Sequence, residues 1–322
     1  MSRRVAIVGG AGRVGSNAAY ALQLGAVCDE IALVDVAAEA AAGEALDLTH
    51  GRAAAGGPRL RAGGYEVLRG SDVVVVTAGV RRQPDESRLQ LLERNTALFR
   101  HILAAVDEQC GDSEAVLLVV TNPVDILTYV AATELGWGKA RTIGLGTMLD
   151  TLRFRSLLAE KMELDPRRVE GMILGEHGDS MVPIFSSLRY RGAPISAASG
   201  CSEEVLREVF ESTRRAGAEV IRLKGGAGYA VGLAVREVVG AILADGHQTL
   251  PVSTLHEEGE FSGVAFSLPT VVGRKGALSV AEVNLTQEEH KALRGSAEVL
   301  RETIAALGGA TPKGASDKEQ RP

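Results

Sequence analysis

Aromatic residues are scarce in this sequence, and no run of apolar residues is long enough to cross a membrane. Phe, Trp and Tyr make up 4 % of the 322 residues, so the core is expected to consist of Val, Ile, Leu and Ala. A membrane helix needs about 18 or more consecutive apolar residues. The apolar residues 5–8 run directly into glycines, so they do not form the apolar centre of a secretory leader. We therefore expect a soluble, cytoplasmic protein with no membrane partner.

Cysteine is also rare, and basic residues are not in excess. Cys28, Cys110 and Cys201 are isolated from one another and odd in number, which excludes a disulfide framework and a zinc ribbon and favours a reducing compartment. The chain has 35 Lys and Arg against 41 Asp and Glu, which gives a formal net charge of -6. This charge disfavours nucleic acid or an anionic membrane as a binding partner.

What the sequence does contain is an alternation of short β-branched runs with helical patterns. Strands are predicted at residues 5–8, 31–35, 73–77 and 116–121, and helices at residues 13–24, 39–49, 86–108 and 124–135. The strands barely alternate between polar and apolar residues, which is typical of parallel strands buried on both faces of a sheet. This order predicts an α/β fold with a doubly wound parallel sheet of the Rossmann type.

The pattern changes after about residue 146. Helices are predicted there at residues 149–162, 203–223, 229–243 and 287–307, and strands at residues 169–174, 250–256 and 263–272. We expect residues 147–309 to form a mixed α+β domain that binds substrate and carries catalysis, rigidly joined to the first half. Residues 310–322 are polar and rich in Gly, Pro and Ser, and they are expected to form a disordered tail.

A glycine-rich turn follows the first predicted strand. Gly10, Gly12 and Gly15 form the G-x-G-x-x-G pattern of dinucleotide-binding proteins, in which glycines allow a tight turn and a close approach to the pyrophosphate. Asp35 ends the next strand about twenty residues later, where a carboxylate accepts the ribose hydroxyls of NAD and repels the extra phosphate of NADP. The alternative is that Asp35 only caps the following helix.

This order of strand, glycine turn, helix, strand and acid favours NAD as the cofactor, and residues 1–146 are the predicted NAD-binding domain. The residues predicted to bind the cofactor in this part of the chain are Gly10, Ala11, Gly12, Arg13, Val14, Gly15 and Asp35.

Four further segments carry polar residues that the fold alone does not require. Residues 80–88 and residues 121–125 each follow a predicted strand, at the edge of the sheet where open α/β folds bind ligands. Asp150 and Arg153 are spaced to share one face of a helix. His177 lies between glycines in the sequence Gly-Glu-His-Gly-Asp. Taken singly, a loop histidine and a helix ion pair worth under about 1 kcal/mol are ordinary surface features.

Taken in order, these motifs resemble those of the lactate/malate dehydrogenase family, from Val5 to about Leu307. The resemblance implies that His177 is the acid/base, Asp150 its partner, Arg153 the clamp for the substrate carboxylate and Arg88 a catalytic lid residue that also binds substrate. It further implies that Asn122 holds the reacting oxygen. The nicotinamide side of the cofactor would be lined by Asn95, Val120, Thr121 and Asn122.

The same resemblance implies a cis peptide at Asn122–Pro123, a homo-oligomer with a tetramer favoured over a dimer, and no metal ion. The chemistry is consistent with these roles. A histidine with a pKa near 6.5 can deliver and accept a proton at neutral pH, and a carboxylate can fix its tautomer. A guanidinium can bind a carboxylate through two parallel hydrogen bonds.

The loop before Pro84 is expected to select the substrate. In the family, malate enzymes carry Arg two residues before the loop proline, where lactate enzymes carry Gln, and Arg82 falls at that position. Ala227 also resembles the malate pattern. A one-residue shift would present Gln83 instead, and residues 85–89 look more like the lactate enzymes. We therefore predict a lactate-dehydrogenase-like malate dehydrogenase of the tricarboxylic acid cycle, acting on the small dicarboxylates malate and oxaloacetate. The alternative is a dehydrogenase of L-lactate or of another 2-hydroxy acid.

Two other classes remain open. An NAD-dependent glycosidase has the same cofactor fold, but it would need a bound metal and a Cys/His ligand set, and Cys201 is far from His177 in the sequence. A non-catalytic NAD-binding regulator would have no reason to combine His177, Asp150 and Arg153.

Overall fold

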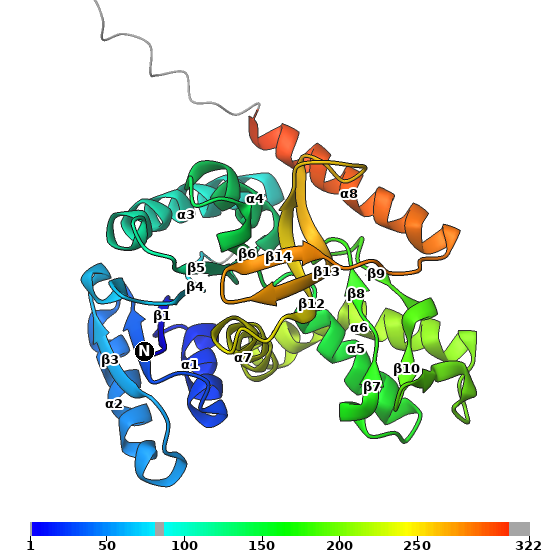
Figure 1. Ribbon diagram of the computed structural model, residues 1–322, viewed down its shortest axis with the longest axis horizontal. Coiled ribbons are helices and arrows are strands. Elements are labelled where there is room, and N and C mark those ends of the chain that lie inside the picture. The colour runs from blue at the N-terminus through cyan, green and yellow to red at the C-terminus, as the bar shows by residue number, and fades with distance from the viewer. Residues whose placement is uncertain (1, 81–86, 309–322) are drawn as a thin grey trace, which may run out of the picture.

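A nine-stranded sheet lies at the centre of the molecule, in the order β14-β13-β12-β6-β5-β4-β1-β2-β3 (Figure 1). The computed structural model describes residues 2–80 and 87–308. Its strands are β1 (Arg4–Val8), β2 (Glu30–Val34), β3 (Arg59–Gly63), β4 (Val73–Val76), β5 (Val116–Val119), β6 (Thr142–Gly144), β7 (Val169–Glu170), β8 (Ile173–Leu174), β9 (Val182–Pro183), β10 (Arg189–Tyr190), β11 (Ala193–Pro194), β12 (Gln248–His256), β13 (Val264–Gly273) and β14 (Gly276–Val280). Its α-helices are α1 (Arg13–Gly25), α2 (Ala38–Ala55), α3 (Arg88–Cys110), α4 (Val124–Glu134), α5 (Met148–Lys161), α6 (Glu203–Lys224), α7 (Tyr229–Leu243) and α8 (Gln287–Gly308).

The six strands β1 to β6 are parallel, which confirms the predicted doubly wound arrangement. Apart from the edge strand β3, these strands are largely buried because helices cover both faces of the sheet; β4 is the sequence Val-Val-Val-Val and is wholly buried. Helices α1 and α2 pack on one face, and α3 and α4 on the other (Figure 1). Strands β3 and β6 are not predicted from the sequence, because β3 is a half-exposed edge strand of sequence Arg-Leu-Arg-Ala-Gly and β6 has only three residues.

The second half of the chain extends the same sheet. Strand β13 pairs antiparallel with both β12 and β14, and β12 joins β6 through Ser253 and Gly144. The sheet therefore crosses the boundary expected at residues 146 and 147. The division into a cofactor half and a catalytic half stays a prediction about function, because the two halves share one sheet.

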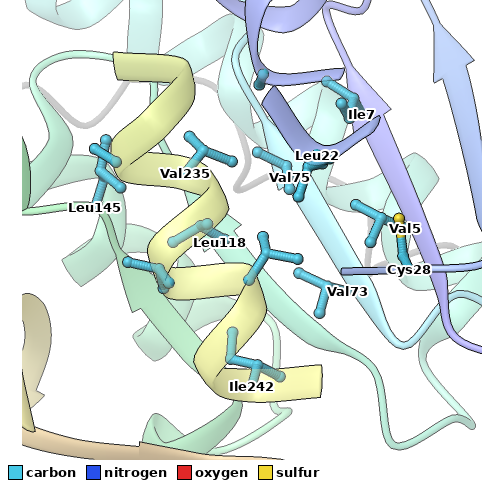
Figure 2. Packing of buried hydrophobic residues seen from close by; sticks show 14 of the residues in the cluster. Val5, Ile7, Leu22, Cys28, Val73, Val75, Leu118, Leu145, Val235 and Ile242 are labelled. Atoms are coloured by element: carbon cyan, nitrogen blue, oxygen red, sulfur yellow. The ribbon is translucent and has the colours of Figure 1, made fainter. Parts of the chain in front are cut away.

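Helix α7, from the second half, also packs on the first half (Figure 2). Val235 and Ile242 on this helix lie in one apolar cluster with sheet residues such as Val75 and Leu118. Gly232 permits this packing, because a Cβ atom there would lie 2.6 Å from the Asn17 carbonyl oxygen of α1. The two halves thus share a continuous hydrophobic core.

The strand predicted at residues 169–174 is divided in two. Gly171 separates β7 from β8; its φ is +144°, and a Cβ atom there would lie 2.2 Å from the Leu188 side chain. Because the chain turns at this glycine, β7 pairs with β10 and β8 pairs with β9. The short strands, together with α5, α6 and α8, form the part of the molecule that carries the predicted histidine (Figure 1).

Among the described residues, no helix is long and apolar enough to cross a membrane. The predicted tail at residues 310–322 lies outside the described residues, as does Arg82 in the predicted selectivity loop.

Candidate active site

The glycine turn after β1 is held by backbone hydrogen bonds. The N–H groups of Gly9 and Gly10 both donate to the Val34 carbonyl, at 2.8 and 3.0 Å, and Gly12 N–H donates to the Gly9 carbonyl at 3.0 Å. A Cβ atom on Gly15 would lie 2.2 Å from the Gly9 oxygen, so only glycine fits where α1 leaves the turn.

Helix α1 begins at Arg13 without a side-chain cap within the described residues. Its first N–H groups and its positive dipole end are therefore available to an anion. The turn and the helix start fit the pyrophosphate of a dinucleotide.

Asp35 is hydrogen-bonded to this turn. Its carboxylate accepts the N–H of Ala11 at 3.0 Å through Oδ2, and the N–H of Ala37 at 3.0 Å through Oδ1. Helix α2 has Ala37, not Asp35, as its N-cap residue. Because a carboxylate oxygen can accept more than one hydrogen bond, Asp35 keeps capacity for the ribose hydroxyls of NAD.

The side chains of two other predicted cofactor residues point away from the turn. Arg13 donates to the carbonyl of Gly226, at 2.9 Å, in the connection between α6 and α7, and to that of Lys224 at the end of α6. Val14 packs against the core. Their backbone N–H groups, not their side chains, are what the turn offers to a phosphate.

The carboxyl ends of β4 and β5 are tied together by polar side chains. Thr121 Oγ1 donates to the Ala78 carbonyl at 2.7 Å. Asn95, which is 3 % exposed, accepts the Val80 N–H at 2.9 Å and donates to the Val80 carbonyl at 3.4 Å. Asn95 thus holds the chain that leads into the predicted selectivity loop, a role that sequence reasoning missed. Whether it also lines the nicotinamide stays a prediction.

Beyond that loop, α3 begins at Arg88, and the structure describes Arg88 only as the first residue of this helix. Ser87 and Gln90 form a reciprocal capping pair that starts the helix, with hydrogen bonds of 3.2 and 2.9 Å. The helix therefore begins just after the segment that is not described, two residues later than predicted.

The peptide between Asn122 and Pro123 is cis, as the family resemblance implied. Val120 and Thr121 donate their N–H groups to the Val76 carbonyl, and α4 starts directly after Pro123. Asn122 Oδ1 accepts the Val124 N–H at 3.3 Å. Its predicted contact with the reacting oxygen stays a prediction.

Asp150 brings together the two functional side chains predicted on the second half. His177 Nδ1 lies 2.5 Å from Asp150 Oδ2, and Arg153 Nη1 lies 3.1 Å from Asp150 Oδ1. The carboxylate is 1 % exposed, whereas the side chains of Arg153 and His177 are 15 % and 20 % exposed. The acid is therefore buried beneath two basic groups that solvent, and hence a small substrate, can reach.

Burial and charge act in opposite directions at this pair. Burial alone would lower the pKa of His177, but the Asp150 carboxylate outweighs it, aided by Asp125, and the pKa lies above its ordinary value. Burial alone would raise the pKa of Asp150, but His177 and Arg153 together hold it below its ordinary value. Asp150 is therefore ionised and favours the imidazolium form of His177.

The loop that carries His177 is anchored by elements that are distant in the sequence. The N–H of His177 donates to Asp125 Oδ2 on α4 at 2.7 Å, and the N–H of Glu176 donates to Ser296 Oγ on α8 at 2.8 Å. Gly175 exchanges two backbone hydrogen bonds with Ser267 on β13. Asp125 lies in the segment of residues 121–125 that the sequence indicates, but the sequence assigns it no role of its own. Ser267 and Ser296 have no signal in the sequence.

Within residues 2–80 and 87–308, no group of three or more His, Cys, Asp or Glu side chains is placed to hold a metal ion. The Cys/His ligand set that the glycosidase alternative requires is therefore not found in the part of the chain that the structure describes.

Comparison with known proteins gives matches over both halves of the chain. Residues 3–144 match the model of the lactate/malate dehydrogenase NAD-binding domain, and residues 147–308 match that of the lactate/malate dehydrogenase α/β C-terminal domain. The first match confirms NAD as the cofactor. An L-lactate dehydrogenase of Thermoanaerobacter pseudethanolicus is 41 % identical over 310 residues, 94 % of this chain and 99 % of that protein. One of a Synechococcus species is 40 % identical over 300 residues, 92 % of this chain and 97 % of that protein.

Solved structures of lactate dehydrogenases are also similar to this chain over nearly its full length. The minor L-lactate dehydrogenase of Enterococcus mundtii superposes with a TM-score of 0.90 at 35 % identity, over 97 % of this chain and 99 % of that chain. A lactate dehydrogenase enzyme from a Medee basin deep-sea metagenome library gives 0.91 at 33 % identity, over 96 % of this chain and 100 % of that chain.

These findings correct the predicted substrate. The expectation of malate and oxaloacetate, of a dicarboxylate partner and of a place in the tricarboxylic acid cycle is wrong, since the relatives over nearly the full chain are named L-lactate dehydrogenase. The error arose from giving Arg82 the role of selector, with Ala227 as further support. Arg81, Arg82 and Gln83 are adjacent, so a register counted from Pro84 cannot fix which side chain meets the substrate.

Proposed function

The chain belongs to the lactate/malate dehydrogenase family, and from this premise we propose that it is an NAD-dependent L-lactate dehydrogenase, interconverting L-lactate and pyruvate. The assembly of His177, Asp150 and Arg153 carries the proposal for a 2-hydroxy acid substrate. The names of the relatives support lactate as that acid.

When bound, NADH supplies the hydride that reduces the C2 ketone. Gly12 and Gly15 leave room for the pyrophosphate at the start of α1, and the Asp35 carboxylate offers acceptors to the ribose. These residues orient the cofactor, and they leave the proton chemistry to the second half of the chain.

His177 would supply the proton that the new alkoxide requires. Its Nδ1 is held by Asp150, so Nε2 is the ring nitrogen left to face the substrate oxygen. Because the pKa of His177 lies above its ordinary value, the imidazolium form is favoured, and the ring can give up its second proton as the alkoxide forms. In the direction of lactate oxidation, the neutral ring accepts the hydroxyl proton.

Arg153 would bind the substrate carboxylate. It donates one Nη1 hydrogen bond to Asp150, which fixes the guanidinium plane and leaves its other N–H groups to a planar carboxylate. Because Asp150 holds both Arg153 and His177, the carboxylate and the carbonyl of one 2-keto acid would be presented in a fixed geometry. Arg88 remains the proposed lid residue that polarises the carbonyl, with the family resemblance as its support.

Oxidation of 2-hydroxy acids tests this proposal. We expect L-lactate with NAD to give rapid NADH formation, and D-lactate and (S)-malate to give little. Reduction of NAD by (S)-malate in preference to L-lactate would contradict the proposal, and no reaction with any of the three acids would also contradict it.

We also propose that the chain works in the cytoplasm as a homo-oligomer, a tetramer according to the family resemblance. Large apolar side chains are exposed on the packed helices α1 and α7, namely Tyr20, Leu24, Tyr229 and Leu233. Such residues are typical of surfaces that a second subunit covers. Sedimentation of the purified protein as a monomer at micromolar concentration would contradict this assembly.

A further inference from the structure

Asp125 is a buried carboxylate directly beneath the histidine loop. It lies in the first turn of α4 and is 3 % exposed. Its Oδ2 accepts the backbone N–H of His177 at 2.7 Å. Its Oδ1 is buried and has no hydrogen-bond partner among the described residues, and the same holds for Ser253 Oγ. The Ser253 hydroxyl lies near enough to lower the pKa of Asp125, although the two oxygens do not form a hydrogen bond.

The fold does not need a charge at this position. A neutral amide oxygen would accept the same backbone N–H, and it would avoid the free energy of burying a carboxylate. Burial raises the pKa of Asp125 to about 6, against the opposing effects of Ser253 and of His177. The dipole of α4 favours a negative charge at its first turn, but it offsets only part of the free energy of burying that charge. At neutral pH, Asp125 is therefore ionised at the expense of folding stability.

The charge acts on His177. Among the described side chains, three charged groups face this histidine: Asp150 and Asp125 raise its pKa, and Arg153 lowers it. Asp125 in turn faces His177 and Glu176, and the hydroxyl of Ser253. The two carboxylates reach the histidine from different helices, since Asp150 is on α5 and Asp125 is on α4.

We propose that Asp125 is a positioning residue for His177: it holds the histidine backbone in place and, together with Asp150, keeps the ring in its imidazolium form. The proposal rests on the proposed function for the use of that proton in keto-acid reduction. It differs from the role of Asp150, because Asp125 contacts the backbone of His177 and not its ring.

The variant Asp125→Asn separates the two parts of this role, because it keeps an acceptor for the N–H and removes the charge. In pyruvate reduction, kcat/KM is constant while His177 is protonated and falls as the pH rises through its pKa. We expect Asp125→Asn to move this fall to lower pH by about one unit. The value at low pH should stay within about threefold of wild type, and the affinity for NADH should be unchanged.

Asp72→Asn is the matched control. Asp72 Oδ2 also accepts one backbone N–H, that of Arg4 at 2.8 Å, at the start of the sheet strands and away from the histidine loop. We expect this variant to keep the pH profile of the wild type. Asp125→Ala, which removes the acceptor as well as the charge, should also lower kcat/KM at low pH.

Thermal unfolding gives a second readout with a definite sign. The pKa of Asp125 in the folded state is raised, so its contribution to stability is present at low pH and is lost as the pH rises through about 6. Asp125→Asn should therefore unfold at neutral pH at a temperature no lower than wild type, while its pH profile is altered. A residue with a purely structural role would show lower stability and an unaltered profile.

The proton on His177 can also be followed without any substrate. Histidine-selective ¹³C labelling gives the titration of the ring, assigned by the signal missing in His177→Asn, and Asp125→Asn should lower this pKa. An unchanged ring pKa in a folded Asp125→Asn enzyme would overturn the proposal about Asp125, even if the wild type reduces pyruvate. A lowered ring pKa in a protein that does not reduce pyruvate would instead overturn the proposed function.

Discussion

The turn at residues 9–15 and the loop at residues 175–180 are both rich in glycine, but they are held in different ways. The first is fixed by backbone hydrogen bonds within one strand-helix-strand unit, such as those from Gly9 and Gly10 to Val34. The second is fixed by Asp125, Asp150 and Ser296, which come from α4, α5 and α8.

This difference separates the two tasks of the enzyme. A backbone turn can hold a phosphate whatever its side chains are, because N–H groups and a helix dipole do the binding. A proton donor needs a tuned pKa, and that requires charges from several elements to converge on one ring. We therefore expect substitutions in the histidine loop to lower kcat and to leave cofactor binding unchanged. Substitutions in the glycine turn should weaken cofactor binding and leave the proton chemistry unchanged.

The largest effect is expected for His177→Asn. Loss of the proton donor should reduce kcat for pyruvate by about 10³-fold or more, while the dissociation constant of NADH, measured by fluorescence, stays near that of wild type. His101→Asn, at an exposed position of α3, serves as the control and should keep full activity. Near-normal turnover in His177→Asn would remove this residue from its proposed role.

Gly15→Ala should have the next largest effect and should act on the cofactor. The new Cβ atom would lie 2.2 Å from the Gly9 oxygen, so the turn must move and NADH binding should weaken by about 100-fold. Gly43→Ala is the matched control, because nothing lies within 4 Å of a Cβ atom at that helical position. There the change should stabilise α2 by about 0.5–1 kcal/mol. Equal effects of the two substitutions would contradict the importance of the close approach.

The sequence predicts the cofactor half well, because the residues that form the glycine turn are close together in the chain. Residues 5–15 contain a strand, a glycine turn and a helix start in one continuous segment, and Asp35 follows at the end of the next strand. The histidine loop could be predicted only in part. His177, Asp150 and Arg153 were identified through the family resemblance, but the anchors Asp125, Ser267 and Ser296 depend on how distant helices and strands pack.

The prediction of substrate failed for a related physical reason. Selectivity depends on which side chain of residues 81–83 faces the ligand, and spacing along the chain does not determine the orientation of a loop residue. The extension of the sheet by β12–β14 also could not be predicted, because pairing partners such as Ser253 and Gly144 are far apart in the sequence.

A moderate effect is expected for Ser296→Ala. This change leaves the partly buried Glu176 N–H without its acceptor, which costs about 1–3 kcal/mol. We expect the looser histidine loop to lower kcat by about tenfold and to leave NADH binding unchanged. Ser113→Ala also removes a serine that accepts a backbone N–H, that of Ala115 at 3.2 Å, and should leave kcat unaltered. A loss of NADH affinity in Ser296→Ala would show that the two loops are coupled.

The smallest effect is expected for Asp35→Ser. Removing the carboxylate lowers the repulsion of the phosphate in NADP, so the preference for NAD, taken as the ratio of the two kcat/KM values, should fall several-fold. Asp47→Ser, at an exposed position of α2, should leave the ratio as it is. An unchanged ratio in Asp35→Ser would mean that the carboxylate serves only to hold Ala11 and Ala37.

Pyruvate as the substrate is tested by NADH oxidation by the wild-type enzyme with pyruvate and with oxaloacetate under identical conditions. We expect kcat/KM for pyruvate to exceed that for oxaloacetate by about tenfold or more. A value for oxaloacetate equal to or above that for pyruvate would contradict this expectation.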